Sequence, residues 1–158
     1  MVLGSRPIER TRTGDFRLRL SDAERALLRD LPQQLLAALA AVPDDPSLRR
    51  LRPAAYEDDA DAEDEYRRLT AEGLAESRSD ALRTVADTAE RDRLTAEELD
   101  AWLRALTDLR LVLGTRLDVT EDTYAQDIDP RDPQAYELSV FAYLSWLQEA
   151  AVEAALQD

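Results

Sequence analysis

Apolar side chains recur at helical spacing between residues 99 and 117, and this stripe is the most regular pattern in the chain. Such spacing places leucine and tryptophan on one face of a helix with 3.6 residues per turn. Directly before the stripe, Thr95-Ala96-Glu97-Glu98 matches a capping box, in which threonine and glutamate each bond the other's backbone amide. The pattern predicts a core helix whose buried face holds Leu99, Trp102, Leu103, Leu106, Leu109, Leu113 and Leu117.

A second capping box, Ser21-Asp22-Ala23-Glu24, predicts another helix start, and Pro43-Asp44-Asp45-Pro46 should end that helix. Its apolar positions are Ala26, Leu27, Leu31, Leu35, Leu39 and Val42. Pro32 lies inside the pattern and has no amide proton to donate, so we expect it to kink or split the helix. Beyond the helix, Leu48 and Leu51 should pack beneath a short turn.

Two further helices are predicted in the rest of the chain. One pattern runs from about Asp58 to Arg91, with apolar positions at Tyr66, Leu69, Gly73, Leu74, Leu82, Val85 and Ala89. Gly73 should permit close packing of a neighbouring helix, and the Ser77-Arg78-Ser79-Asp80 cluster leaves open whether this is one helix or two. The final helix should begin with Asp132 as N-cap and Pro133 at the first position. Its apolar face would contain Tyr136, Val140, Phe141, Leu144, Leu147, Val152 and Leu156.

Apolar and charged residues alternate around the turn sequence Thr13-Gly14-Asp15, which predicts a short β-hairpin from Pro7 to Leu20. One strand face would hold Phe16, Leu18 and Leu20, and the other Arg17 and Arg19. Because an isolated hairpin is marginal in water, it should lie on the helices with its arginines outward. No other segment shows a strand pattern. We therefore predict a mainly α fold, a single-domain helical bundle over residues 1–158 with residues 1–20 as a hairpin arm.

Most of the usual catalytic side chains are missing, because the chain contains no His, Cys, Lys or Asn. This excludes imidazole acid–base chemistry, thiolate nucleophiles, Schiff-base amines and Cys or His metal sites. We expect a protein that is not an enzyme and has no cofactor. The lack of Cys, of a signal-peptide pattern in Met1–Gly14 and of an uninterrupted apolar span also predicts a cytoplasmic protein that does not enter a membrane.

The chain is strongly acidic, with 34 acidic and 20 basic residues and a formal net charge of −14. Because phosphate contacts dominate nucleic-acid affinity, this charge disfavours binding to DNA or RNA. The hairpin arm is an exception, since Arg6, Arg10, Arg12, Arg17 and Arg19 face only Glu9 and Asp15 there. DNA binding through this arm is a weaker alternative. A homodimer in which the arm meets an acidic helix start is a further hypothesis.

Seven carboxylates lie within residues 57–65, and Asp58, Asp61 and Glu65 would share one helix face. Clustered oxygens suit Mg²⁺ or Ca²⁺, but acids at a helix N-terminus also complement the helix dipole. We favour a solvated helix start. An acidic docking surface at Asp58, Asp61, Asp64 and Glu65 and a carboxylate-based divalent-metal or small-ligand site remain alternatives.

A second candidate site follows the core helix, where Arg116 is close in sequence to Asp118, Glu121 and Asp122. A guanidinium held by carboxylates could fix the exit of the helix. Alternatively, Arg110 and Arg116 could form an anion or interaction groove together with these acids. We favour the structural pair, because arginines beside acids more often serve architecture than ligand binding.

Four aromatic residues, Trp102, Trp146, Tyr136 and Tyr143, could form a recognition patch. Core packing is the better interpretation, because both tryptophans stand beside apolar stripe positions. We expect largely buried rings whose polar tips lie near the surface.

The phrases Tyr66–Thr70, Leu109–Asp122 and Tyr143–Glu149 resemble the uncharacterised actinobacterial domain-of-unknown-function family two-zero-one-seven. The resemblance covers nearly the whole chain and brings no catalytic residues. It implies a small cytoplasmic protein, often encoded beside the adaptor of the Clp protease and near genes of sulfur transfer or nicotinate metabolism. The leading hypothesis is a non-enzymatic interaction or regulatory protein with an unknown protein partner and a link to protein turnover.

Overall fold

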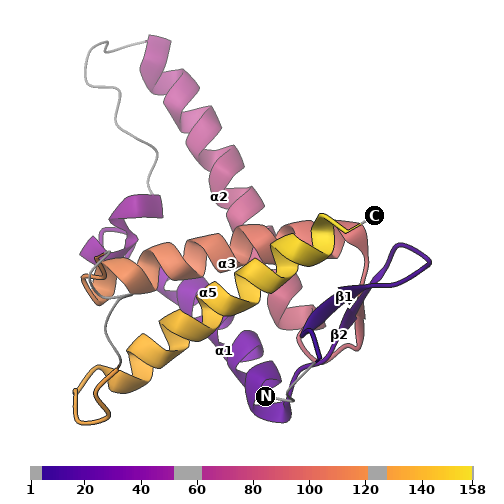
Figure 1. Cartoon of the computed structure of the whole chain (residues 1–158). Coiled ribbons are helices and arrows are strands. Elements are labelled where there is room, and N and C mark those ends of the chain that lie inside the picture. Colours follow the sequence, from indigo (N-terminus) through magenta and orange to yellow (C-terminus); the bar gives the residue numbers. More distant parts are fainter. Residues whose placement is uncertain (1–4, 52–61, 121–127, 158) are drawn as a thin grey trace.

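The computed structural model describes residues 5–51, 62–120 and 128–157, and only the backbone of residues 62–71 (Figure 1). In chain order the elements are β1 (Ile8–Arg10), β2 (Phe16–Leu18), α1 (Asp22–Ala41), the 3₁₀ helix η1 (Pro46–Leu51), α2 (Ala62–Thr88), β3 (Arg93–Leu94), α3 (Ala96–Arg116) and α5 (Ala135–Ala155). The fold is mainly helical, with a small antiparallel sheet, which confirms the predicted fold class.

Helix α3 lies at the centre of the fold and packs against α1, α2, α5 and η1 (Figure 1). Its predicted stripe is confirmed, because Leu99, Trp102, Leu106, Leu109 and Leu117 are buried and Leu103 and Leu113 are partly buried. Leu48 and Leu51 of η1 are also buried, as predicted. Burial of each such leucine contributes about 1.5–3 kcal/mol, so these contacts hold the other elements around α3.

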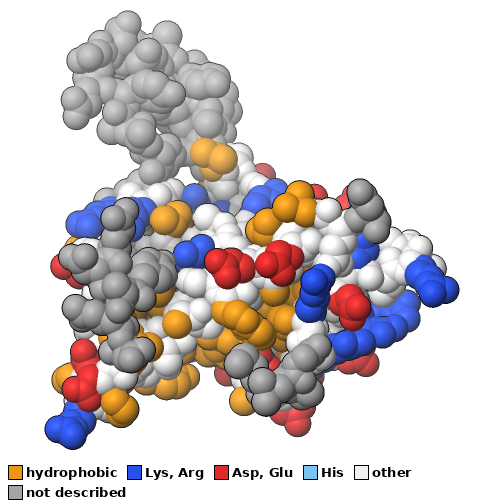
Figure 2. Space-filling view, in the orientation of Figure 1, with side chains coloured by type: hydrophobic (Ala, Val, Ile, Leu, Met, Phe, Trp, Pro, Cys, Tyr) orange, Lys and Arg blue, Asp and Glu red, His pale blue; other side chains and the backbone are white. Residues whose placement is uncertain are grey.

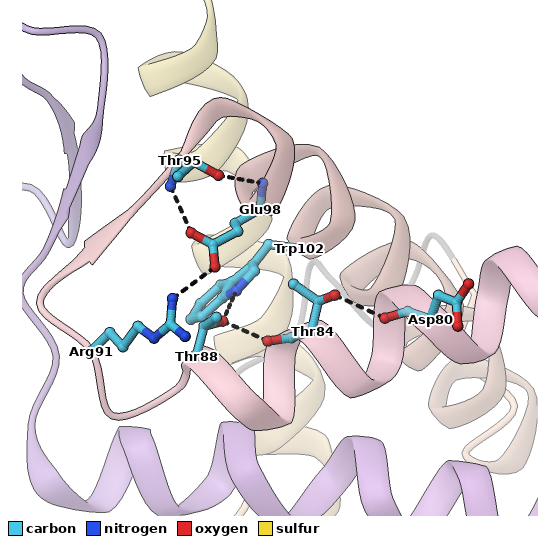
Figure 3. Close-up of polar contacts among 7 residues, drawn as sticks. All are labelled: Asp80, Thr84, Thr88, Arg91, Thr95, Glu98 and Trp102. Atoms are coloured by element: carbon cyan, nitrogen blue, oxygen red, sulfur yellow. Dashed lines mark hydrogen bonds and ion pairs between the residues drawn. The ribbon is translucent and has the colours of Figure 1, made fainter.

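The indole of Trp102 is fully buried and donates its Nε1 proton to Thr88 Oγ1 at 2.8 Å (Figure 3). Thr88, only 2% exposed, donates its hydroxyl proton to the Thr84 carbonyl at 2.6 Å. The expectation that this indole has its polar tip near the surface was wrong. A hydroxyl on the neighbouring helix satisfies the N–H inside the core, and the bond joins α2 to α3.

Both predicted capping boxes are present. Ser21 and Glu24 begin α1, and Thr95 and Glu98 begin α3 with reciprocal bonds of 2.9 and 3.1 Å. The Glu98 carboxylate also accepts from Arg91 Nη1 at 3.0 Å, as Figure 3 shows. The cap therefore also holds the connection between α2 and α3.

Helix α1 continues through Pro32, so the expectation of a split there was wrong. Pro32 is buried, and its packing offsets the missing backbone bond. On the same helix, Arg25 donates to the carbonyls of Ala89 and Arg91 at 3.1 and 2.6 Å. A cation at these positions satisfies the carbonyls beyond the end of α2 and is favoured by the helix dipole.

The sheet has the strand order β1-β2-β3, and its third strand was not predicted. Phe16 pairs with Leu94, and both are buried together with Ile8 and Leu18. Arg17 and Arg19 are exposed, which confirms the predicted orientation of the hairpin. β3 contains only two residues, so it has no alternation of its own and depends on pairing with β2.

Helix α2 runs without a break through Ser77–Asp80, which decides in favour of one helix. Its buried side chains come from the C-terminal part, whereas all of residues 72–76 are exposed and Leu74 is 48% exposed. The N-terminal half extends away from the other helices (Figure 1). The expected close packing at Gly73 was therefore wrong, since a Cβ there would meet nothing within 4 Å.

Helix α5 begins at Ala135 rather than at Pro133. Asp132 accepts from the Gln134 amide at 2.8 Å, so its carboxylate stabilises a turn before the helix instead of capping it. Tyr136, Val152 and Leu156, expected in the core, are 73, 42 and 78% exposed. Tyr136 lies in the first turn of α5, where α3 has already ended at Arg116 and offers no surface to cover the ring.

Candidate functional site: two arginine-lined grooves beside α3

A groove of about 430 Å³ lies between η1, α3 and α5, and we call it the Arg110 groove. It is lined by Arg50, Thr107, Arg110, Leu111, Gly114, Val119, Thr120 and Phe141. Gly114 brings the two helices together here, because a Cβ at this position would lie 3.2 Å from Phe141 Cε2. The groove therefore combines two guanidinium groups with an apolar floor.

Polar contacts between α3 and α5 orient Arg110. Its Nη1 donates to Gln148 Oε1, and Gln148 Nε2 donates to Thr107 Oγ1 at 2.6 Å. The Arg110 Cζ atom lies 5.7 Å from the centroid of the Phe141 ring. These contacts restrict the side chain to one direction, which lowers the entropy cost of any interaction it makes with a ligand.

The structure does not bring the predicted groove residues Arg110, Arg116 and Asp118 together. Arg116 is exposed, does not line the groove, and forms no ion pair with Asp118 among the residues described. Its place is taken by Arg50 from η1, which sequence reasoning missed. Glu121 and Asp122 lie outside the described residues.

Asp118 has a role in the backbone at the end of α3. Its φ is +52°, and the amides of Asp118 and Val119 donate to the carbonyls of Thr115 and Gly114 at 3.3 and 2.9 Å. This is a Schellman arrangement, in which one residue with positive φ satisfies the last carbonyls of a helix. In the described part of the chain, backbone bonds rather than an arginine–carboxylate pair end α3.

A second groove, the Leu103 groove, has a volume of about 420 Å³ and lies between α2, α3 and α5. It is lined by Leu74, Ser77, Arg78, Leu103, Arg104, Thr107, Asp108, Gln148 and Val152. Thr107 lines both grooves, so the Thr107–Gln148–Arg110 contacts stand where the two meet. Leu74 and Val152 are 48 and 42% exposed at its rim.

An ion pair is built into the wall of the Leu103 groove. Arg78 Nε lies 3.2 Å from Asp108 Oδ2, and Arg78 Nη2 donates to the Leu51 carbonyl at 2.8 Å. Burial raises the pKa of Asp108, and this effect outweighs the opposing attraction of Arg78. Four arginines and one carboxylate line the two grooves, and Arg78 pairs with that carboxylate.

The side chains of the predicted acidic docking surface lie outside the described part of the structure. Asp58 and Asp61 fall outside the described residues, and the side chains of Asp64 and Glu65 are not described. In the described ranges, no three acidic side chains are grouped so that they could hold a metal ion. Among the described helices, none combines the length and hydropathy of a membrane span.

The four aromatic side chains are not assembled into a recognition patch, which was the less favoured alternative. Tyr143 and Trp146 are partly buried, with ring centroids 5.8 Å apart, and burial together with the nearby Glu24 carboxylate raises the pKa of Tyr143. Trp102 is inside the core, and Tyr136 projects into solvent. Trp102, Tyr136 and the Tyr143–Trp146 pair therefore have separate surroundings, and the four rings do not form one recognition surface.

Fold and surface together define a mainly helical protein with a small sheet, open arginine-lined grooves and none of the residue types used for imidazole or thiol chemistry. A family model described as Domain of unknown function (DUF2017) matches residues 5–155, and the chain belongs to this family. This confirms the resemblance drawn from the sequence.

Similar proteins have been named in mycobacteria. The chain is 31% identical to the oxidative stress regulator AosR of Mycobacterium tuberculosis (strain ATCC 25618 / H37Rv), over 90% of this chain and 83% of the relative. The AosR protein of Mycobacterium bovis (strain ATCC BAA-935 / AF2122/97) shows the same identity and coverage. No solved structure matches the chain.

Proposed function

We propose that this protein is a non-enzymatic regulator that acts by binding a partner protein. The similarity over 90% of the chain to proteins named oxidative stress regulators carries the regulatory part of the proposal. Redox sensors often use a reactive thiol, but these 158 residues contain no Cys. Recognition of another molecule is therefore the means of regulation that we infer.

The proposed docking site is the Leu103 groove together with the adjoining Arg110 groove. Exposed Leu74 and Val152 flank Leu103, which gives an apolar track between helices. From Leu103 to Gly114 the two grooves follow α3 for roughly 16 Å, at 1.5 Å per residue, or about three helical turns, with the polar Thr107–Gln148–Arg110 contacts between them. This length suits an amphipathic helix that lays its apolar face into a groove.

Charge selects the kind of helix. Arginines outnumber carboxylates four to one in the groove linings, whereas the whole chain has a net charge of −14. Complementary potential speeds association and excludes wrong partners. The proposed occupant is therefore an amphipathic helix with acidic side chains along its polar edges.

A designed peptide pair tests this proposal. Both peptides are helices of four turns with leucine at positions i, i+3, i+4 and i+7, and the flanking residues are glutamate in one and lysine in the other. Fluorescence anisotropy should show tighter binding of the glutamate peptide. The substitution Val152→Glu should weaken that binding at least tenfold, because it places a charge in the apolar track.

Val42→Glu is the matched control, since Val42 is 52% exposed at the end of α1 and lines neither groove. It changes the net charge by the same amount. Equal binding by the two variants, preference for the lysine peptide, or no binding at millimolar peptide would each refute the docking site.

Cytoplasmic location, a link to protein turnover, homodimer formation and a divalent-metal site remain predictions from the sequence. Calorimetry with Mg²⁺, Mn²⁺ and Ca²⁺ tests the metal alternative, and sedimentation at two ionic strengths tests the electrostatic dimer.

A further inference from the structure

The outer face of the three-stranded sheet places two arginines side by side. Arg17 on β2 is directly opposite Arg93 on β3, and both are exposed. Like charges in such cross-strand positions destabilise a sheet. Neither arginine forms an ion pair with any residue that the structure describes. Glu9 on β1 is directly opposite Arg17 on its other side, but the carboxylate of Glu9 forms its ion pair with Arg19 instead.

These arginines belong to a hollow of about 500 Å³ at the hairpin end of the molecule. Arg10 and Arg12 also line it, as do two threonines, and Glu9 is its single carboxylate. Glu9 pairs with Arg19 at 3.3 Å, so this acid is already occupied. Figure 2 shows the resulting group of basic side chains over the hairpin end.

The backbone beneath the arginines is held in place. Phe16 and Leu94, the residues next to Arg17 and Arg93, form a buried cross-strand pair on the opposite face of the sheet. Cβ atoms of directly opposite residues in an antiparallel pair lie about 4.5–5.5 Å apart. Two guanidinium groups held at this spacing can bond the oxygens of one phosphoryl group from two sides.

We propose that this face of the sheet binds a small molecule that carries a pyrophosphate group, with Arg17 and Arg93 contacting the same phosphoryl oxygens. The lining has a formal charge of +3, from four arginines and one glutamate, which suits a multiply charged anion better than a single carboxylate. The lining contains no aromatic side chain on which a nucleobase could stack. A net charge of −14 also opposes the long polyanion of a nucleic acid.

Titration calorimetry of the full chain with inorganic pyrophosphate tests the proposal, with inorganic phosphate and a short DNA duplex as separate titrants. We expect pyrophosphate to bind more tightly than phosphate, and binding to weaken as salt increases. The double variant R17Q/R93Q should bind pyrophosphate at least tenfold more weakly. Its thermal midpoint should equal or exceed that of the wild type, because the like-charge contact is removed.

Arg49→Gln is a control for the loss of an exposed arginine elsewhere, because Arg49 is exposed on η1 and lies outside the hollow. This variant should bind pyrophosphate within twofold of the wild type. Absence of pyrophosphate binding at millimolar concentration, or equal weakening by R49Q and the double variant, would overturn the proposal. Binding of the DNA duplex without binding of pyrophosphate would overturn it too and would make the face a nucleic-acid interface. None of these outcomes depends on the grooves beside α3.

Discussion

The hydrogen bond between Trp102 and Thr88 gives a sharp test of how α2 and α3 are joined. Thr88→Val keeps the shape of the side chain and removes the hydroxyl oxygen that accepts the buried indole proton, with Trp102 Nε1 and Thr88 Oγ1 2.8 Å apart in the wild type. A buried donor left without a partner costs about 1–3 kcal/mol. We expect the free energy of unfolding to fall by that amount, or the thermal midpoint by about 2–4 °C per kcal/mol for a chain of this size.

Urea unfolding followed by far-UV circular dichroism measures the effect, with Thr84→Val as the control. Thr84 donates its hydroxyl to the Asp80 carbonyl of its own helix at 2.9 Å, so its loss should change stability by no more than about 0.5 kcal/mol. In a Trp102→Phe background the indole proton is absent, and Thr88→Val should then cost at least about 1 kcal/mol less. If Thr88→Val is no more harmful than Thr84→Val, the bond does not contribute as we argue.

Three further predictions concern other local features. Gly73→Ala should stabilise the protein by about 0.5–1 kcal/mol, because α2 has open space there. Gly114→Ala should stabilise it less or destabilise it, because the new Cβ would lie 3.2 Å from Phe141, and equal gains of the two variants in urea unfolding would contradict this. Asp118→Gly should stabilise by about 0.5–1 kcal/mol, since φ is +52° there, and a thermal midpoint below that of the wild type would contradict the Schellman assignment. Asp108 has a pKa raised by burial, so its contribution to stability is full below the pKa of the unfolded chain and is lost as pH rises through the folded pKa. The wild type should therefore lose stability relative to Asp108→Asn as the pH rises above about 4, the ordinary pKa of an aspartate, and a difference that grows in the wild type's favour would refute this.

Helix starts were predictable wherever the capping chemistry is local. Ser21 and Thr95 each cap a helix through a glutamate three residues later, so four consecutive residues contain the whole signal. Asp132-Pro133 also matched a helix start, with Asp as N-cap and Pro at the first position. There, however, the carboxylate accepts from the Gln134 amide in a turn, and the helix begins two residues later than predicted. An aspartate can cap a helix or stabilise a turn, and only the path of the backbone distinguishes the two roles.

Contacts between distant elements were not predictable. Sequence analysis found Arg110, but Gln148, its hydrogen-bond partner, is 38 positions away on another helix. Alternation predicted that Arg17 faces outward, yet the opposing Arg93 lies on a two-residue strand with no pattern of its own. The first contact depends on how α5 packs on α3, and the second on how β3 pairs with β2. Neither arrangement leaves a pattern of fixed residue spacing in the sequence.

The contact between β1 and α5 has a consequence for the order of folding. Arg10 donates to the Gln157 carbonyl, which is 147 positions away, and β1 packs against α5. Helices α2 and α3 are neighbours along the chain, so they can associate after closing only a short loop, whereas this contact closes nearly the whole chain and loses more entropy. We infer that the pair α2–α3 forms the folding nucleus and that β1 docks on α5 late. Weakening the β1–α5 contact would then accelerate unfolding and leave the folding rate almost unchanged.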